Sequence, residues 1–197
     1  MIPAVILAAG ASTRMGQPKA LLPVDRSGES FLSRITRTLL EAECPEVLIV
    51  LGHDAEGIRR TIGDPNQRVR LLENRDFARG QLSSLLIALD AADRPGVEGL
   101  LVTLVDVPLV SASTVRAIIS AYRTRHRPIV RPVRHGRHGH PVLFDRGLFV
   151  ELRQADPDLG ARAVVHAHAS EIDNVEVDDV GAFLDFDTPE DCRRLSL

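Results

Sequence analysis

The sequence has little of several features that mark whole classes of protein. Its 197 residues include two cysteines, Cys44 and Cys192, far apart along the chain, which excludes a disulfide scaffold and a four-cysteine zinc site and fits a reducing cytoplasm. The longest apolar stretches, such as residues 4–9 and 99–105, fall well short of the ~20 residues that a membrane span needs. No basic segment precedes residues 4–9, so we expect no signal peptide.

Strong charge of one sign is also missing. The chain carries 24 basic and 27 acidic side chains, and the formal charge of −3 argues against a general nucleic-acid binder. The hydrophobic share of 44% is that of an ordinary globular protein. We therefore expect one domain over residues 1–197.

Lysine is nearly absent. Lys19 is the only lysine among the 24 basic residues, the others being arginine. A codon bias toward arginine would explain most of this skew, but not why the single lysine follows a glycine-rich turn. A tight phosphate-binding loop can accept the compact ammonium group of lysine and refuse the planar guanidinium group of arginine. Lys19 is therefore a candidate functional residue.

Apolar runs alternate with helix-like segments along most of the chain. Strands are expected at residues 3–8, 47–51, 69–72 and 99–105, and helices at residues 31–43, around Ile58 and Ile62, from Gly80, and from an N-cap at Ser113. Continuously apolar strands that are each followed by a helix indicate an α/β fold with a mainly parallel, twisted sheet covered by helices on both faces. Such sheets bind ligands at the carboxyl ends of their strands. The loops after Ala8 and Val105 are thus the most informative.

The last third of the chain is less regular. Residues 123–140 hold six arginines and four histidines without an acid, and residues 171–191 hold nine acids without a base. These blocks are either solvated faces, or a basic rim for an anionic substrate and an acidic edge for a metal. A strand over residues 182–186 is expected to carry Asp185 and lead to Asp187, ahead of a helix with Thr188 as N-cap and Pro189 at its first position.

The loop after the first strand is suited to phosphate binding. Residues 7–19 read LAAGASTRMGQPK, and a run of small residues exposes successive backbone N–H groups to phosphate oxygens. The P-loop pattern G-x-x-x-x-G-K-S/T fails because Lys19 does not follow Gly16, and the dinucleotide pattern G-x-G-x-x-G also fails. The chain is therefore neither a P-loop ATPase nor a Rossmann dehydrogenase.

This loop resembles the signature of the MobA-like nucleotidyltransferases, approximately L-A-A/G-G-x-S-x-R-M-G-x-P/D-K. The version with Ala9 and Pro18 is similar to the molybdenum cofactor cytidylyltransferase branch. The resemblance continues through residues 74–85, through the D-V-P-L-V segment from Asp106, and through residues 139–144, 158–162 and 185–191. This chain has Val107 where the family often has methionine, and Pro157 where it often has glycine.

The resemblance implies a Rossmann-like nucleotidyltransferase fold and the transfer of CMP from CTP to molybdopterin that carries molybdenum, with Mg²⁺ and release of pyrophosphate. A molybdenum hydroxylase would be the client that receives the product. The roles implied for this chain are phosphate or catalytic contacts by Arg14, Lys19 and Asp106; nucleotide contacts by Ala8, Ala9, Gly10, Ser12, Gly16, Gly80, Ser83 and Ser84; and acceptor contacts by His140, Asp158 and Arg162.

The residue types support such chemistry without the family. A phosphate monoester is already ionised at neutral pH, so nucleotidyl transfer needs positioning and charge neutralisation rather than a strong base. Mg²⁺ prefers carboxylate, phosphate and water oxygens. Asp106 follows a buried strand, and Asp185 or Asp187 could reach the same crevice, which predicts a two-carboxylate metal site. Each carboxylate could instead cap the turn after its strand.

Several alternatives stay open. GTP could be the nucleotide, or another phosphorylated molecule the acceptor, on the same fold. A protein of another class, a non-catalytic carrier that delivers the cofactor to an oxidoreductase, is also compatible with the sequence. The histidines at positions 135, 138 and 140 could suggest zinc, but no fourth ligand is evident.

Overall fold

The computed structural model describes residues 1–63, 65–193 and 195. Its centre is an eight-stranded sheet with the order β3-β2-β1-β4-β7-β5-β6, in which β8 pairs with β5. The strands are β1 (Ala4–Ala8), β2 (Val47–Leu51), β3 (Val69–Glu73), β4 (Gly99–Leu104), β5 (Ile129–Arg134), β6 (Arg137–His138), β7 (Val142–Asp145) and β8 (Ile172–Glu176).

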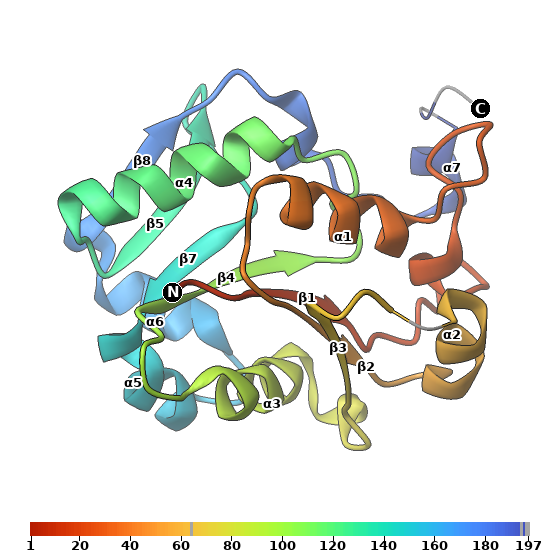
Figure 1. Ribbon diagram of the computed structural model, residues 1–197, viewed down its shortest axis with the longest axis horizontal. Helices are drawn as coiled ribbons and strands as arrows, with labels where there is room; N and C mark the ends of the chain where they lie inside the picture. Colours follow the sequence, from red (N-terminus) through yellow and green to blue (C-terminus); the bar gives the residue numbers. More distant parts are fainter. Residues whose placement is uncertain (64, 194, 196–197) are drawn as a thin grey trace.

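Helices lie on both sides of this sheet, as predicted (Figure 1). Helices α1 and α4 cover one face, and α3, α5 and α6 cover the other. The helices are α1 (Phe31–Glu41), α2 (Ala55–Ile62), α3 (Gln81–Ala92), α4 (Ala112–Arg125), α5 (Phe149–Gln154), α6 (Ala161–Ala167) and α7 (Pro189–Cys192). Short 3-10 helices are η1 (Lys19–Leu21), η2 (Phe77–Arg79), η3 (Arg146–Leu148), η4 (Ala169–Glu171) and η5 (Val180–Phe183).

The central strands are buried on both faces because helices cover both. Every residue of β1 and β2 is buried. Successive side chains of a strand point to opposite faces, so Ile6 packs into the core under α1 and α4 while Val5 packs into the core over α3. This double coverage explains why these strands are continuously apolar in sequence.

The sheet has a parallel half and a mixed half. β3, β2, β1 and β4 are parallel. β7 runs antiparallel to both β4 and β5, and β8 is parallel to β5. The carboxyl ends of β1 and β4 therefore meet at one edge, which brings the loops after Ala8 and Leu104 together.

Two local predictions are wrong. The N-cap of α4 is Ser111 rather than Ser113, since the Ser111 hydroxyl accepts the Thr114 N–H and Ser113 is already inside the helix. Residues 182–186 are not a strand: η5 occupies residues 180–183, and the chain then runs on without a sheet partner to Thr188. The start of α7 is as predicted, with a reciprocal capping box between Thr188 and Asp191.

No helix in the described part of the chain is long and apolar enough to cross a membrane.

Candidate active site

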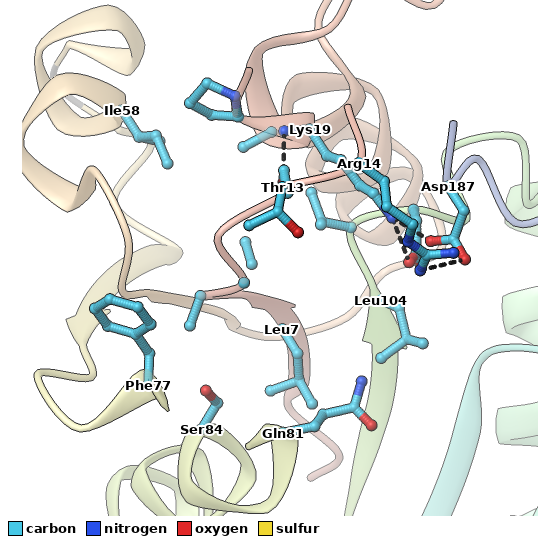
Figure 2. Close-up of a pocket in the computed structure, with 18 of the residues that line it drawn as sticks. Leu7, Thr13, Arg14, Lys19, Ile58, Phe77, Gln81, Ser84, Leu104 and Asp187 are labelled. Carbon is cyan, nitrogen blue, oxygen red and sulfur yellow. Dashed lines mark hydrogen bonds and ion pairs between the residues drawn. The ribbon is translucent and has the colours of Figure 1, made fainter. Parts of the chain in front are cut away.

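A cavity of about 360 Å³ opens at the carboxyl ends of β1 and β4 (Figure 2). Its walls come from the first loop, the start of α3, the turn after β4 and the segment before α7. The predicted site residues that line it are Ala8, Ala9, Gly10, Ser12, Arg14, Lys19, Gly80, Ser84, Asp106 and Asp187. Gly16, Ser83 and Asp185 do not line it.

The first loop presents free backbone donors to this cavity. Ser12 adopts a left-handed conformation with φ of 50°, and its carbonyl accepts the N–H groups of Met15 at 2.9 Å and Gly16 at 3.2 Å. The N–H groups of Gly10, Ala11 and Thr13 meet no acceptor among the described residues. Successive unpaired N–H groups in such a turn form an anion-binding concavity. Gly16, with φ of 73°, closes the turn behind the loop.

Lys19 lies between two carboxylates. Its Nζ is 3.1 Å from Asp106 Oδ2 and 2.5 Å from Asp187 Oδ1. The side chain of Lys19 is only 11% exposed. Desolvation acts to lower the pKa of Lys19, but the hydrogen bond to Asp187 and the charge of Asp106 outweigh it and raise this pKa. Lys19 is therefore a fixed positive charge.

Asp187 also holds the arginine of the first loop. Arg14 Nη2 is 3.0 Å from Asp187 Oδ2, and Figure 2 shows the two side chains facing each other. The hydrogen bond from Lys19, with the charges of Lys19 and Arg14, lowers the pKa of Asp187. Asp187 thus links the first loop to the segment before α7, although the two are more than 150 residues apart in sequence.

Asp106 keeps one buried oxygen free. Its Oδ1 is buried and has no hydrogen-bond partner among the described residues, while Oδ2 accepts from Lys19. Desolvation and the charge of Asp106 raise the pKa of Asp185, so these two carboxylates lie close enough to repel each other. A cation beside Asp106 Oδ1 would satisfy the free oxygen and relieve this repulsion.

No group of three or more histidine, cysteine or acidic side chains in the described residues is arranged to hold a metal by itself. Two carboxylates with phosphate and water oxygens are the usual surroundings of Mg²⁺, whereas a closed zinc site needs four protein ligands. The donor set therefore fits a cation that is bound together with a phosphorylated ligand.

The segment that carries Asp185 and Asp187 is fixed by close backbone contacts. Phe186 N donates to Asp106 O at 2.9 Å, and His140 N donates to Ala182 O at 2.9 Å. A Cβ atom at Gly181 would lie 2.0 Å from Leu109 O, so only glycine permits this approach. Asp187 reaches the cavity through these contacts and not from a strand.

The two predicted serines have different positions. Ser84 is buried and lines the cavity, whereas the Ser83 hydroxyl donates to Gly80 O at 2.7 Å in the first turn of α3. Both hydroxyls accept from Asn74 Nδ2, at 2.8 Å for Ser83 and 2.9 Å for Ser84. Asn74 is a buried residue that our candidate set lacks. Asn74 belongs to residues 74–85, which resemble the family, but only its hydrogen bonds to Ser83 and Ser84 in the fold show that it positions these serines.

The predicted acceptor residues lie in a second cavity. It has a volume of about 460 Å³ and is lined by His140, Asp158 and Arg162 among others. Burial lowers the pKa of His140 despite the nearby charges of Asp106 and Asp185. His140 Nδ1 is buried, and no residue that the structure describes forms a hydrogen bond with it. The second cavity adjoins the first through residues that line both.

The two charge blocks of the last third lie against each other. Since β5 and β8 are parallel neighbours, Arg134 comes within 3.3 Å of Asp178, and Arg131 Nε donates to Asn174 Oδ1 at 2.9 Å. Arg125 is paired with Asp173 at 2.7 Å. These contacts favour a mutually paired face for this part of the two blocks, whereas Asp187 and His140, from the same blocks, line the two cavities.

Comparison with known proteins identifies the family of this chain. Residues 4–172 match the model of the MobA-like NTP transferase domain. Nicotine blue oxidoreductase of Paenarthrobacter nicotinovorans is 34% identical over 97% of this chain and 94% of its own length. The molybdenum cofactor cytidylyltransferase of Escherichia coli is 27% identical over 96% of this chain and 93% of its own.

Solved structures support the same fold and family. The crystal structure of Rv0371c from Mycobacterium tuberculosis is 31% identical, with a TM-score of 0.83 over 99% of this chain and 97% of that one. A structure of Rv0371c in complex with manganese has a TM-score of 0.77 at 29% identity, over 98% of this chain and 97% of that one. The chain therefore belongs to the MobA-like NTP transferase family and is a nucleotidyltransferase.

Proposed function

We propose that this nucleotidyltransferase moves CMP from CTP to molybdopterin that carries molybdenum, with release of pyrophosphate. The observation that supports this most directly is the junction of two cavities beside the Lys19, Asp106 and Asp187 cluster. One cavity holds phosphate-binding elements, and the other holds the residues that resemble the cytidylyl branch at the acceptor. A transfer between two substrates needs a binding site for each substrate and a place where their reacting atoms meet.

In this proposal the first loop holds the triphosphate. Free N–H groups of the loop, with Arg14 and Lys19, bind its oxygens and neutralise the charge of the leaving pyrophosphate. An oxygen of the acceptor phosphate attacks the α-phosphorus, the new P–O bond forms, and the bond to the β-phosphate breaks with its electron pair leaving on pyrophosphate. The attacking oxygen is already ionised, so no proton has to move.

The residues that would hold a divalent cation are Asp106 with Asp185 or Asp187. Mg²⁺, when bound, supplies charge neutralisation at the α-phosphate. Before substrate enters, Lys19 and Arg14 occupy the carboxylate oxygens of Asp187. Substrate binding would transfer these cationic groups from the carboxylates to the phosphates.

The preference for CTP rests on Ala9 and Pro18 of the first loop, which match the cytidylyl branch. The remote end of the first cavity, with Ile58, Phe77 and Ser84, would receive the base. The experiment is to incubate the protein with Mg²⁺, each of the four nucleoside triphosphates and a panel of phosphorylated acceptors including molybdopterin, and to measure pyrophosphate release. Equal kcat/KM for CTP and GTP, or a preference for GTP, would remove the cytidylyl assignment.

A second candidate function follows from the comparison with nicotine blue oxidoreductase, whose name describes redox rather than transfer chemistry. A redox enzyme would bind a dinucleotide in the first cavity and a reducible substrate in the second. NAD(P)H oxidation with quinone-like dyes tests this directly. The Lys19 and Asp106 cluster favours transfer, since hydride transfer has no need of a charge-neutralising group at a leaving phosphate.

A carrier that only delivers the cofactor to a molybdenum hydroxylase is the remaining alternative. Such a protein would bind molybdopterin and release no pyrophosphate. The same assay therefore separates carriage from catalysis.

A further inference from the structure

The two cavities share four lining residues, Leu7, Gly80, Gln81 and Leu104. We call this shared boundary the neck. Leu7 and Leu104 are apolar and Gly80 has no side chain. In the described part of the chain, Gln81 is thus the one shared lining residue whose side chain can form hydrogen bonds.

Gln81 is free to use its amide for a ligand. It is the first residue of α3, it is exposed, and its side-chain amide contacts no hydrogen-bond partner among the described residues. Figure 2 shows this side chain directed into the space between Leu7 and Leu104. A glutamine amide offers two N–H donors and one carbonyl acceptor.

We infer that Gln81 positions the acceptor phosphate against the α-phosphate of the nucleotide. This inference rests on the proposed function. If the nucleotide occupies the first cavity and the acceptor the second, the attacking oxygen and the α-phosphorus meet at the neck. An amide donor there would bind a phosphate oxygen of the acceptor while the P–O bond to the nucleotide forms and pyrophosphate leaves.

The polar groups near Gln81 are engaged in other hydrogen bonds or line only one of the two cavities. The Ser83 hydroxyl donates to Gly80 O, and Ser84, Lys19 and Asp187 line the first cavity but not the second. Gly80 at the N-cap of α3 has no side chain to cap the helix, so the partial positive charge of the first turn adds to the attraction for phosphate at the neck. His140 lines the second cavity and not the first.

Two substitutions separate the amide donors from the shape of the side chain. Gln81→Met keeps an unbranched side chain of similar length and removes the hydrogen bonds. Gln81→Glu keeps the shape, removes the donors and adds a negative charge that faces the phosphate. The matched control is Gln154→Met at the exposed end of α5, a residue that lines neither cavity.

The experiment measures kcat and KM for molybdopterin carrying molybdenum at saturating CTP, with the dissociation constant of CTP measured separately without acceptor. Melting temperatures check the fold of each variant. For Gln81→Met we expect kcat/KM for the acceptor to fall about 10- to 100-fold, as for loss of one well-placed donor. For Gln81→Glu we expect a larger fall, and for both variants an unchanged CTP dissociation constant.

Two results would overturn the inference while the proposed function stands. One is acceptor kinetics within a few-fold of wild type. The other is a weaker CTP affinity together with acceptor kinetics that return to wild-type values when the CTP concentration is raised, which would make Gln81 a contact to the nucleotide alone. If wild type itself releases no pyrophosphate with any nucleotide and acceptor pair, the proposed function fails, and this inference fails with it.

Discussion

At the scale of single residues, the charge balance around Lys19 defines the site. In the absence of substrate its ammonium group bridges Asp106 and Asp187, and Arg14 also pairs with Asp187, so two positive and two negative groups compensate one another. Triphosphate must compete with these carboxylates for Lys19 and Arg14. The sequence could identify Lys19 by its rarity and Asp106 by its position after a strand, but it could not reveal this mutual neutralisation.

Lys19→Arg tests whether the position needs lysine or only a positive charge. Lys19 is almost enclosed, and a guanidinium group is broader and donates in a fixed plane. A displacement of about 1 Å at a positioning group can cost roughly 100-fold in rate. We expect Lys19→Arg to lose nearly as much pyrophosphate release as Lys19→Ala, with little change in melting temperature. Near-normal turnover by Lys19→Arg would mean that a codon bias is enough to explain the single lysine.

Asp106→Asn tests the free carboxylate oxygen. An amide has nearly the same shape, so the backbone contact from Phe186 should persist. The loss of negative charge should weaken cation binding and reduce turnover by about 100-fold or more, on the order of 3 kcal/mol. Manganese binding, measured by calorimetry in the presence of nucleotide, should weaken in parallel. Asp90→Asn on α3 is the control, and a turnover within a few-fold of wild type would make Asp106 a turn cap.

At the scale of elements, the segment from η5 to α7 depends on close packing that sequence patterns do not record. Gly181→Ala would place a Cβ atom 2.0 Å from Leu109 O and push η5 away from the turn after β4. We expect a lower melting temperature and loss of most activity, because Asp185 and Asp187 follow η5. Val180→Ala in the same helix is the control, since Val180 is 50% exposed. If Gly181→Ala remained fully active, the position of η5 would not determine the site.

A second element-level contact joins α5 to the chain after α6. His168 lies between two acids, with Nε2 2.8 Å from Glu151 and Nδ1 2.8 Å from Glu171. The hydrogen bonds to Glu151 and Glu171 raise the pKa of His168. A raised pKa in the folded state means that the stabilisation is complete below the unfolded pKa near 6.5 and is lost as pH rises through the folded value.

His168→Gln should therefore lower the melting temperature more at pH 6 than at pH 9. The measurement is a series of melting curves of both proteins across this range. His166→Gln, in the last turn of α6, is the control. A difference between wild type and His168→Gln that stays constant with pH would show that the imidazole is neutral throughout.

At the scale of the whole molecule, the parallel half of the sheet could be predicted and the mixed half could not. Val47–Leu51 is buried on both faces and therefore apolar throughout. β8, by contrast, is partly exposed and includes Asp173 and Asn174, and β5 contains Pro132. Their pairing depends on contacts between residues about 40 positions apart, which local periodicity does not encode. The same limit applies to Asn74 and Gln81, whose roles follow from neighbours in space.

The arrangement of the sheet suggests that its two halves bind different substrates, and this can be tested. The first loop of the parallel half lines the first cavity, and α6, which packs near the mixed half, contributes Arg162 to the second. If each half binds one substrate, Arg162→Gln should raise KM for the acceptor by about 10-fold or more, the effect of losing one hydrogen bond to a charged group. The dissociation constant of CTP should not change in this variant. Arg14→Gln should instead weaken CTP binding and leave the acceptor KM unchanged.

The control for loss of an arginine is Arg153→Gln on α5, because Arg153 is paired with Asp90 and Asp93. Equal effects of Arg14→Gln and Arg162→Gln on both substrates would contradict separate sites and indicate that one cavity holds both ligands.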